Sequence, residues 1–108
     1  MTFTYPQTGK SIDIDCLLDS GADDTLINAD LAGQLGINLT TGPRQLYQGI
    51  SSGPTPAYDH RLFMQVENDT NKFEINAAFM PGLQTACLLG RNGFFLIVTD
   101  SVDRPKWG

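Results

Sequence analysis

Apolar positions near the start of the chain alternate with polar ones. In FTYPQTGKSIDIDCLLD, the apolar residues recur at every second position on both sides of a break at Thr8-Gly9-Lys10. A period of two is typical of strands with one buried face, and a glycine-containing break between two such runs is typical of a hairpin. We therefore expect a hairpin that leads into a strand ending at Asp19.

The hydrophobic period changes in a later segment, TLINADLAGQLGI. Asn28 or Asp30 is placed to act as an N-cap, Leu31 and Leu35 are four residues apart, and Gly36 is placed to end a helix. This segment predicts one short helix after the first strands.

The remaining segments read as strands separated by turns. Residues 40–60 are dense in glycine, proline and serine and predict turns and a mobile hairpin, whereas residues 61–82 predict a strand, a turn at NDTN and a second strand. TACLLGRNGFFLIVTD predicts a buried strand that breaks at Gly90 and continues into one helical turn, and residues 98–108 predict a loose tail. The pattern indicates a mainly β fold with one or two short helices, as a small closed barrel or sandwich in a single domain, residues 1–108.

Two short segments of the sequence resemble each other. CLLDSGA begins at Cys16 and CLLGRNG begins at Cys87, and both place Cys-Leu-Leu before a glycine-containing break. We expect two apolar strands that end in tight turns and approach each other near one point.

The composition of the chain limits its partners and its location. Its 108 residues carry a net charge of −5 and no basic run, which argues against a nucleic-acid surface. The opening MTFTYPQTGK lacks the charged start and apolar core of a signal peptide, and the apolar runs are far shorter than the ~20 residues that span a bilayer. We expect a cytoplasmic protein that binds neither nucleic acid nor membrane.

Cys16 and Cys87 each lie in an apolar run. In a cytoplasmic protein, we expect them as reduced core residues and not as a disulfide. With a single histidine, His60, they do not make up a zinc-ligand set, so we expect no metal and no organic cofactor.

Two local patterns suggest other chemistries but lack the context that these require. GISSG fits the Gly-x-Ser-x-Gly of serine hydrolases, yet Pro54 and Pro56 follow where a helix has to begin. DSGADD offers three carboxylates for calcium, but its glycine is third where an EF-hand loop needs glycine in the sixth position. Neither a serine hydrolase nor a calcium loop is supported.

A third pattern places Asp19 as an acid–base catalyst. Asp-Ser-Gly directly follows an apolar run, and its glycine lets the backbone turn tightly and approach the carboxylate. Peptide hydrolysis by this chemistry needs two carboxylates that share one proton: one activates water and the other protonates the carbonyl oxygen. The chain has one Asp-Ser-Gly. The second carboxylate would therefore come from a second copy of the chain.

Together, LLDSGADDTLI, YQGISSG and LLGRNGFF resemble the retropepsin-like aspartic peptidases, which include the retroviral proteases and their cellular and bacterial relatives. The helix predicted in NADLAGQLGI resembles the cellular and bacterial branch more than the retroviral one. The resemblance implies a closed acid-protease barrel that works as a homodimer, with one Asp19 from each subunit, and that hydrolyses a peptide bound in an extended conformation.

The same resemblance implies roles for the residues around Asp19. Ser20 would replace the usual threonine, whose hydroxyl reaches across the dimer, and Gly21 would offer its carbonyl to the substrate backbone. Ala22 and Asp23 would line the site, with Arg91 pairing with Asp23 to brace the active-site loop. Three further residues would lie at or near the tip of a flap that closes over the substrate: Gly49, Ile50 and Ser51.

Two alternatives to a constitutive endopeptidase remain open. The flap segment GISSGPTP has fewer glycines and more prolines than the retroviral type, which suits a non-catalytic dimerisation or peptide-binding module that keeps the fold. An enzyme inactive as a monomer and activated by assembly is the other alternative. The presence of Asp19, Gly21 and Arg91 favours catalysis.

Overall fold

The chain begins with the hairpin that the alternating pattern predicts. The computed structural model of the chain describes residues 1–19, 21–47, 53–67 and 69–93. Strand β1 (Thr2–Thr4) pairs with β2 (Ser11–Asp13), with Phe3 opposite Ile12. Both of these side chains are buried, whereas their neighbours on the strands are more exposed. One face of the hairpin therefore belongs to the core.

The described part of the chain forms one eight-stranded sheet. After β2 the elements follow in the order β3 (Leu17–Leu18), β4 (Thr25–Asn28), η1 (Ala29–Leu31), α1 (Ala32–Leu35), η2 (Leu39–Thr41), β5 (Arg44–Tyr47), β6 (Thr55–Gln65), β7 (Lys72–Met80) and β8 (Cys87–Leu89). The strand order is β2-β1-β6-β7-β4-β8-β3, and β5 pairs with β6. Strand β4 runs parallel to β7 and β3 runs parallel to β8, and the other pairs are antiparallel. The mainly β prediction is confirmed.

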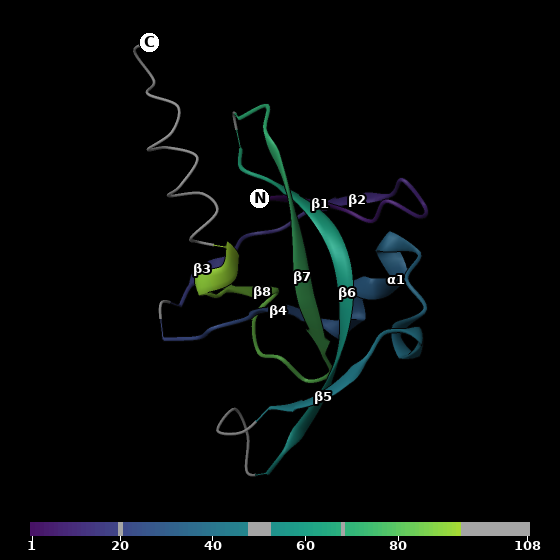
Figure 1. Ribbon diagram of the computed structural model, residues 1–108, viewed down its shortest axis with the longest axis vertical. Coiled ribbons are helices and arrows are strands. Elements are labelled where there is room, and N and C mark those ends of the chain that lie inside the picture. Colours follow the sequence, from purple (N-terminus) through teal and green to yellow (C-terminus); the bar gives the residue numbers. More distant parts are fainter. Residues whose placement is uncertain (20, 48–52, 68, 94–108) are drawn as a thin grey trace.

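In the described part of the chain the sheet curls into a half-barrel, which agrees with the predicted barrel-type fold except that it is not fully closed. The long strands β6 and β7 bow through the middle of the molecule, with the β1–β2 hairpin crossing near one end and β5 at the other (Figure 1). Within the described ranges, the outer strands β2 and β3 do not pair with each other. They contain three and two residues, respectively.

The middle of the sheet is buried on both faces. On β7, Ala77 and Phe79 belong to the larger core cluster, whereas Ala78 and Met80 belong to a smaller one. Successive side chains on a strand point to opposite faces, so the two clusters lie on either side of the sheet. Because both faces of β7 are buried there, the strand carries apolar residues at consecutive positions, 77–80, and not at every second one.

The predicted helix forms as two short turns that pack against the core. Asn28 is the cap: its side-chain oxygen accepts a hydrogen bond from the backbone N–H of Asp30 at 2.9 Å, which begins η1. Helix α1 follows, buries Leu35 completely and ends at Gly36, whose φ of 71° is left-handed. No helix in the described residues is long and apolar enough to cross a membrane.

Strand β6 is longer than the sequence indicates. The prediction separated a hairpin ending near His60 from a new strand, whereas β6 runs for 11 residues through that position without a break. His60 is buried, because its ring lies edge-on between Tyr5 and Phe79 and its Nε2 is 2.8 Å from the carbonyl oxygen of Leu39. This histidine is part of the core.

Candidate functional site

Asp19 follows a strand that is held by a distant part of the chain. Strand β3 lies parallel to β8 in register, with Leu17 opposite Leu88, and the backbone N–H of Asp19 donates to the carbonyl oxygen of Leu89 at 3.0 Å. The two Cys-Leu-Leu segments therefore lie side by side, as the sequence predicts for two strands that meet. Their pairing brings the loops that follow them together.

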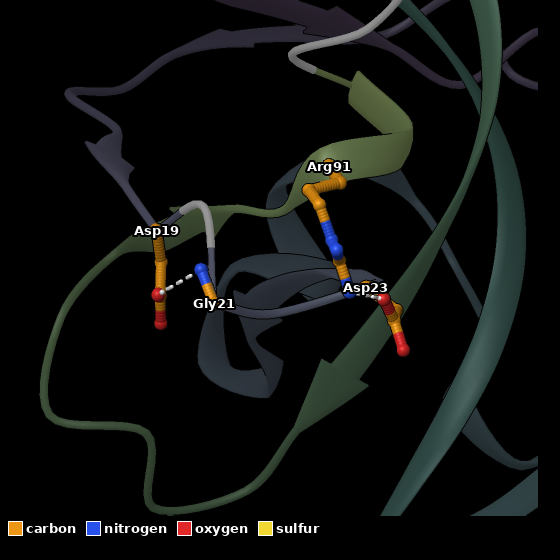
Figure 2. Close-up of polar contacts among 4 residues, drawn as sticks. All are labelled: Asp19, Gly21, Asp23 and Arg91. Carbon is orange, nitrogen blue, oxygen red and sulfur yellow. Dashed lines mark hydrogen bonds and ion pairs between the residues drawn. The ribbon is translucent and has the colours of Figure 1, made fainter.

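The loop after Asp19 holds the carboxylate in place. The backbone N–H of Gly21 donates to Oδ1 of Asp19 at 3.1 Å (Figure 2). The N–H of Ala22 donates to the Asp19 carbonyl oxygen at 3.1 Å. This arrangement is an Asx-type turn, in which an aspartate accepts from a backbone group two residues later. One carboxylate oxygen is fixed by a backbone dipole while the side chain stays partly exposed.

Two backbone hydrogen bonds brace the Asp19 loop from the turn that follows β8. The N–H of Arg91 donates to the carbonyl oxygen of Ala22 at 2.8 Å, and the N–H of Asn92 donates to that of Asp23 at 3.1 Å. The Arg91 guanidinium also forms the expected ion pair with Asp23 (Figure 2). Those two side chains are 59% and 81% exposed, so the pair contributes at most about 1 kcal/mol. The backbone bonds are therefore the main brace.

A buried hydroxyl lies beneath this brace, and sequence reasoning missed it. Thr25 is fully buried; its Oγ1 donates to Oδ1 of Asn92 at 2.7 Å and accepts from the N–H of Gly90 at 3.3 Å. The Asn92 side chain also donates to the Asn76 carbonyl oxygen at 3.2 Å. A polar residue at the start of the apolar run TLI and the glycine in LLGRNG are the signals that could have located this network.

A second connection links the β5–β6 hairpin to the same loop. The Tyr47 hydroxyl, at the end of β5, donates to Oδ2 of Asp24 at 3.1 Å. Burial raises the pKa of Tyr47 above its usual range, and the hydrogen bond to the Asp24 carboxylate raises it further. Burial also raises the pKa of Asp59, a neighbour on β6, against the lowering effect of its hydrogen bond from Gln45. No sequence motif indicated this connection.

An apolar groove lies beside β3. Its volume is about 560 Å³, and it is lined by Leu17, Thr55, Met80, Pro81, Gly82, Leu83, Gln84, Thr85 and Leu88. Leu17 and Leu18 are 58% and 66% exposed, although they belong to an apolar run. Asp19 therefore lies next to apolar surface that this chain alone leaves open to solvent.

Several predicted site residues lie outside the described residues. They are Ser20, Gly49, Ile50 and Ser51. The last three belong to the connection between β5 and β6, and the predicted tail, residues 98–108, also lies outside. The structure thus brings together Asp19, Gly21, Ala22, Asp23 and Arg91. Among the described residues, it contains no cluster of three or more histidine, cysteine, aspartate or glutamate residues that could hold a metal ion.

Both the sequence and the fold of the chain are similar to those of known proteases. The family model described as aspartyl protease matches residues 7–92. Among solved structures, the EIAV protease complexed with the inhibitor HBY-793 superposes with a TM-score of 0.50, at 18% sequence identity, over 91% of this chain and 86% of that chain. No curated protein sequence matches the chain. The structural match supports a retroviral-protease fold, in agreement with the resemblance found in the sequence motifs.

Proposed function

The chain belongs to the aspartyl protease family, and we propose that it is an endopeptidase that works as a homodimer, with Asp19 of each subunit at the catalytic centre. One observation carries this proposal: Asp19 ends a strand next to an apolar groove, and its Oδ1 accepts from the Gly21 N–H at 3.1 Å. A carboxylate held in this way is positioned for proton transfer to or from water.

The proposed reaction uses the two carboxylates as acid and base in turn. One Asp19 takes a proton from water, whose oxygen attacks the peptide carbonyl carbon, while the other Asp19 gives its proton to the carbonyl oxygen. The tetrahedral intermediate then collapses: the first Asp19 gives the proton that it took from water to the nitrogen, the C–N bond breaks, and the second Asp19 takes its proton back from a hydroxyl of the intermediate. A carboxylic acid and an amine leave, and the pair again holds one proton. Two carboxyl groups this close do not both ionise, because their negative charges would repel each other. The pair of Asp19 side chains therefore carries one proton at the pH where the enzyme is active.

The edge position of β3 supports the need for a second subunit. This strand has two residues, ends the sheet in the described part of the chain, and exposes Leu18 directly before Asp19. A second copy docked against this edge would cover that leucine and bring its own Asp19 near the first. Ser20 would reach across this interface through its hydroxyl.

The groove supports an extended peptide with an apolar side chain as the substrate. Leu17, Leu83 and Leu88 offer apolar surface for a side chain near the bond to be cut. The carbonyl oxygen of Gly21 would accept a main-chain hydrogen bond from the peptide, and Ala22 and Asp23 would line its path. The segment with Gly49, Ile50 and Ser51, which joins β5 to β6, would form the flap over it.

The test is cleavage of a peptide library over about pH 3–7, a range that brackets a shared-proton pair of carboxylates. Wild type and Asp19→Asn are compared at several protein concentrations, because asparagine keeps the acceptor for Gly21 but cannot exchange a proton. We expect cleavage by wild type only, favouring apolar residues next to the cut and rising faster than linearly with concentration.

Equal cleavage by Asp19→Asn would refute Asp19 as the catalyst, and a linear concentration dependence at all dilutions would refute assembly from monomers. A folded dimer that binds the same peptides without cutting them would instead establish a peptide-binding module. Circular dichroism of both proteins controls for folding.

A further inference from the structure

The two cysteines of the chain lie beside each other in the fold. Cys87 begins β8, and Cys16 directly precedes β3. These strands pair in parallel with Leu17 opposite Leu88, and Cys16 and Cys87 each directly precede these paired residues. The two thiols interact with each other through a side-chain hydrogen bond. Figure 1 shows β3 and β8 side by side at the edge of the sheet. Residues far apart in the sequence thus become neighbours on adjacent strands.

The spacing of adjacent strands is compatible with a disulfide at this place. Adjacent strands lie about 4.8 Å apart, and bonded cysteines usually have Cα atoms about 4.4–6.8 Å apart. Side chains at paired positions point to the same face of a sheet. In agreement, Cys87 is fully buried in the larger core cluster, and Cys16 packs against that cluster. Both cysteines are free thiols in the structure.

We propose that Cys16 and Cys87 form a reversible dithiol–disulfide pair that joins β3 to β8. This site is independent of peptide cleavage. Its effect would be structural, because the two strands lead directly into the Asp19 loop and into the turn with Gly90 and Arg91 that braces it.

The two thiols differ in a way that assigns their roles. A hydrogen bond from Cys87 lowers the pKa of the Cys16 thiol, against the raising effect of burial. The same interaction, together with burial, raises the pKa of Cys87. Cys16 is also the more exposed of the two. Because a dissolved oxidant reaches the half-buried Cys16 and not the fully buried Cys87, we assign Cys16 as the attacking thiolate and Cys87 as the thiol that resolves the intermediate.

With a small disulfide such as oxidised glutathione as the oxidant, the reaction balances in two steps. The Cys16 thiolate attacks one glutathione sulfur, forms a mixed disulfide and releases glutathione as a thiolate. Once Cys16 is bound in this way, its negative charge no longer opposes ionisation of Cys87. Cys87 then loses its proton and attacks the Cys16 sulfur, which releases the second glutathione. Two protein thiols are oxidised, and one glutathione disulfide is reduced to two thiols.

The experiment treats the full chain with oxidised glutathione and follows intact mass, free thiols and melting temperature at one protein concentration. We expect a monomer that is lighter by two hydrogens, with no titratable thiol, in which proteolysis finds Cys16 linked to Cys87. The bond closes a loop of about 70 residues, so the melting temperature should rise by at least about 10 °C and return on reduction.

Two variants separate the roles of the thiols. In Cys87→Ala, Cys16 should keep one glutathione as a mixed disulfide, because no resolving thiol remains. In Cys16→Ala, the buried Cys87 should stay unmodified while the protein is folded. Circular dichroism of both variants controls for folding, because alanine at the fully buried Cys87 removes packed volume.

Three results would overturn the proposal: a stable mixed disulfide on wild type, a disulfide between two chains on a non-reducing gel, or an oxidised protein that melts no higher than the reduced one. None of these readouts depends on proteolytic activity, so failure here and failure of the proposed function are distinguishable.

Discussion

Residue 90 has to be glycine because two backbones pass close to each other there. A Cβ on Gly90 would lie 2.2 Å from the carbonyl oxygen of Asp24, which is less than any real contact distance. The N–H of Gly90 also donates to the buried Thr25 hydroxyl at 3.3 Å. At the residue scale, the site therefore depends on the absence of a side chain as much as on the presence of Asp19.

We predict that Gly90→Ala destabilises the protein by about 2–3 kcal/mol, because the loop after β8 must move away from the Asp19 loop to admit the methyl group. Chemical denaturation of wild type and variant measures the change in the free energy of unfolding.

Gly33→Ala is the matched control. Gly33 lies in α1, and a methyl group on its Cα would meet no atom within 4 Å apart from its chain neighbours and the backbone of its own helix. Alanine there should therefore be neutral or stabilising by up to about 1 kcal/mol. A Gly90→Ala protein as stable as Gly33→Ala would contradict the close approach.

At the scale of elements, Asn28 connects two of them, β4 and η1, to the turn that follows β7. It ends β4, its side-chain oxygen caps η1 by accepting from Asp30 at 2.9 Å, and its amide Nδ2 donates to the carbonyl oxygen of Leu83 at 2.9 Å. Leu83 also lines the apolar groove. One side chain thus joins the start of the helical segment to a wall of the proposed binding site.

We predict that Asn28→Ala lowers the free energy of unfolding by about 1–2 kcal/mol, since it removes the cap and leaves the Leu83 carbonyl without this donor. Asn28→Asp keeps the capping oxygen but not the donor, so it should recover part of the loss. Denaturant midpoints of the three proteins measure both effects. Equal losses in the two variants would show that the cap contributes nothing.

The elements that the sequence predicts well are those determined by near neighbours. The β1–β2 hairpin and the cap at Asn28 follow from spacing and turn chemistry within a few residues. The length of β6 was not predictable in this way. Glycine, proline and serine before residue 55 suggest turns, but pairing with β5, β1 and β7 keeps the strand extended past His60. Long-range hydrogen bonds override local preference there.

At the scale of the whole molecule, exposed leucines mark the edge of the sheet next to the candidate site. Leu18 is 66% exposed on β3, whereas Leu46, on β5, is 53% exposed at another position. An apolar side chain exposed at a short edge strand is typical of a surface that a partner covers. Leu18 can therefore be used to test the proposed dimer interface, with Leu46 as the control for an exposed leucine elsewhere.

We predict that Leu18→Lys weakens self-association, because it would place a charge in the proposed interface, while Leu46→Lys leaves self-association unchanged. Sedimentation velocity over a range of concentrations measures both. Equal dimerisation of wild type and Leu18→Lys would show that copies of the chain do not meet at this edge.

The sequence by itself determined the local features: the alternation that makes the first hairpin, the capped helical segment, and an Asp-Ser-Gly turn at the end of an apolar run. Each of these features depends on residues that lie close together in the sequence. Only the tertiary structure decided that β3 lies in register with β8, that Thr25 and Asn92 support the Asp19 loop, and that the sheet stays open in the described part of the chain. These features depend on contacts between residues that are tens of positions apart in the sequence. Packing and backbone pairing decide which distant segments meet, and no local pattern encodes that choice.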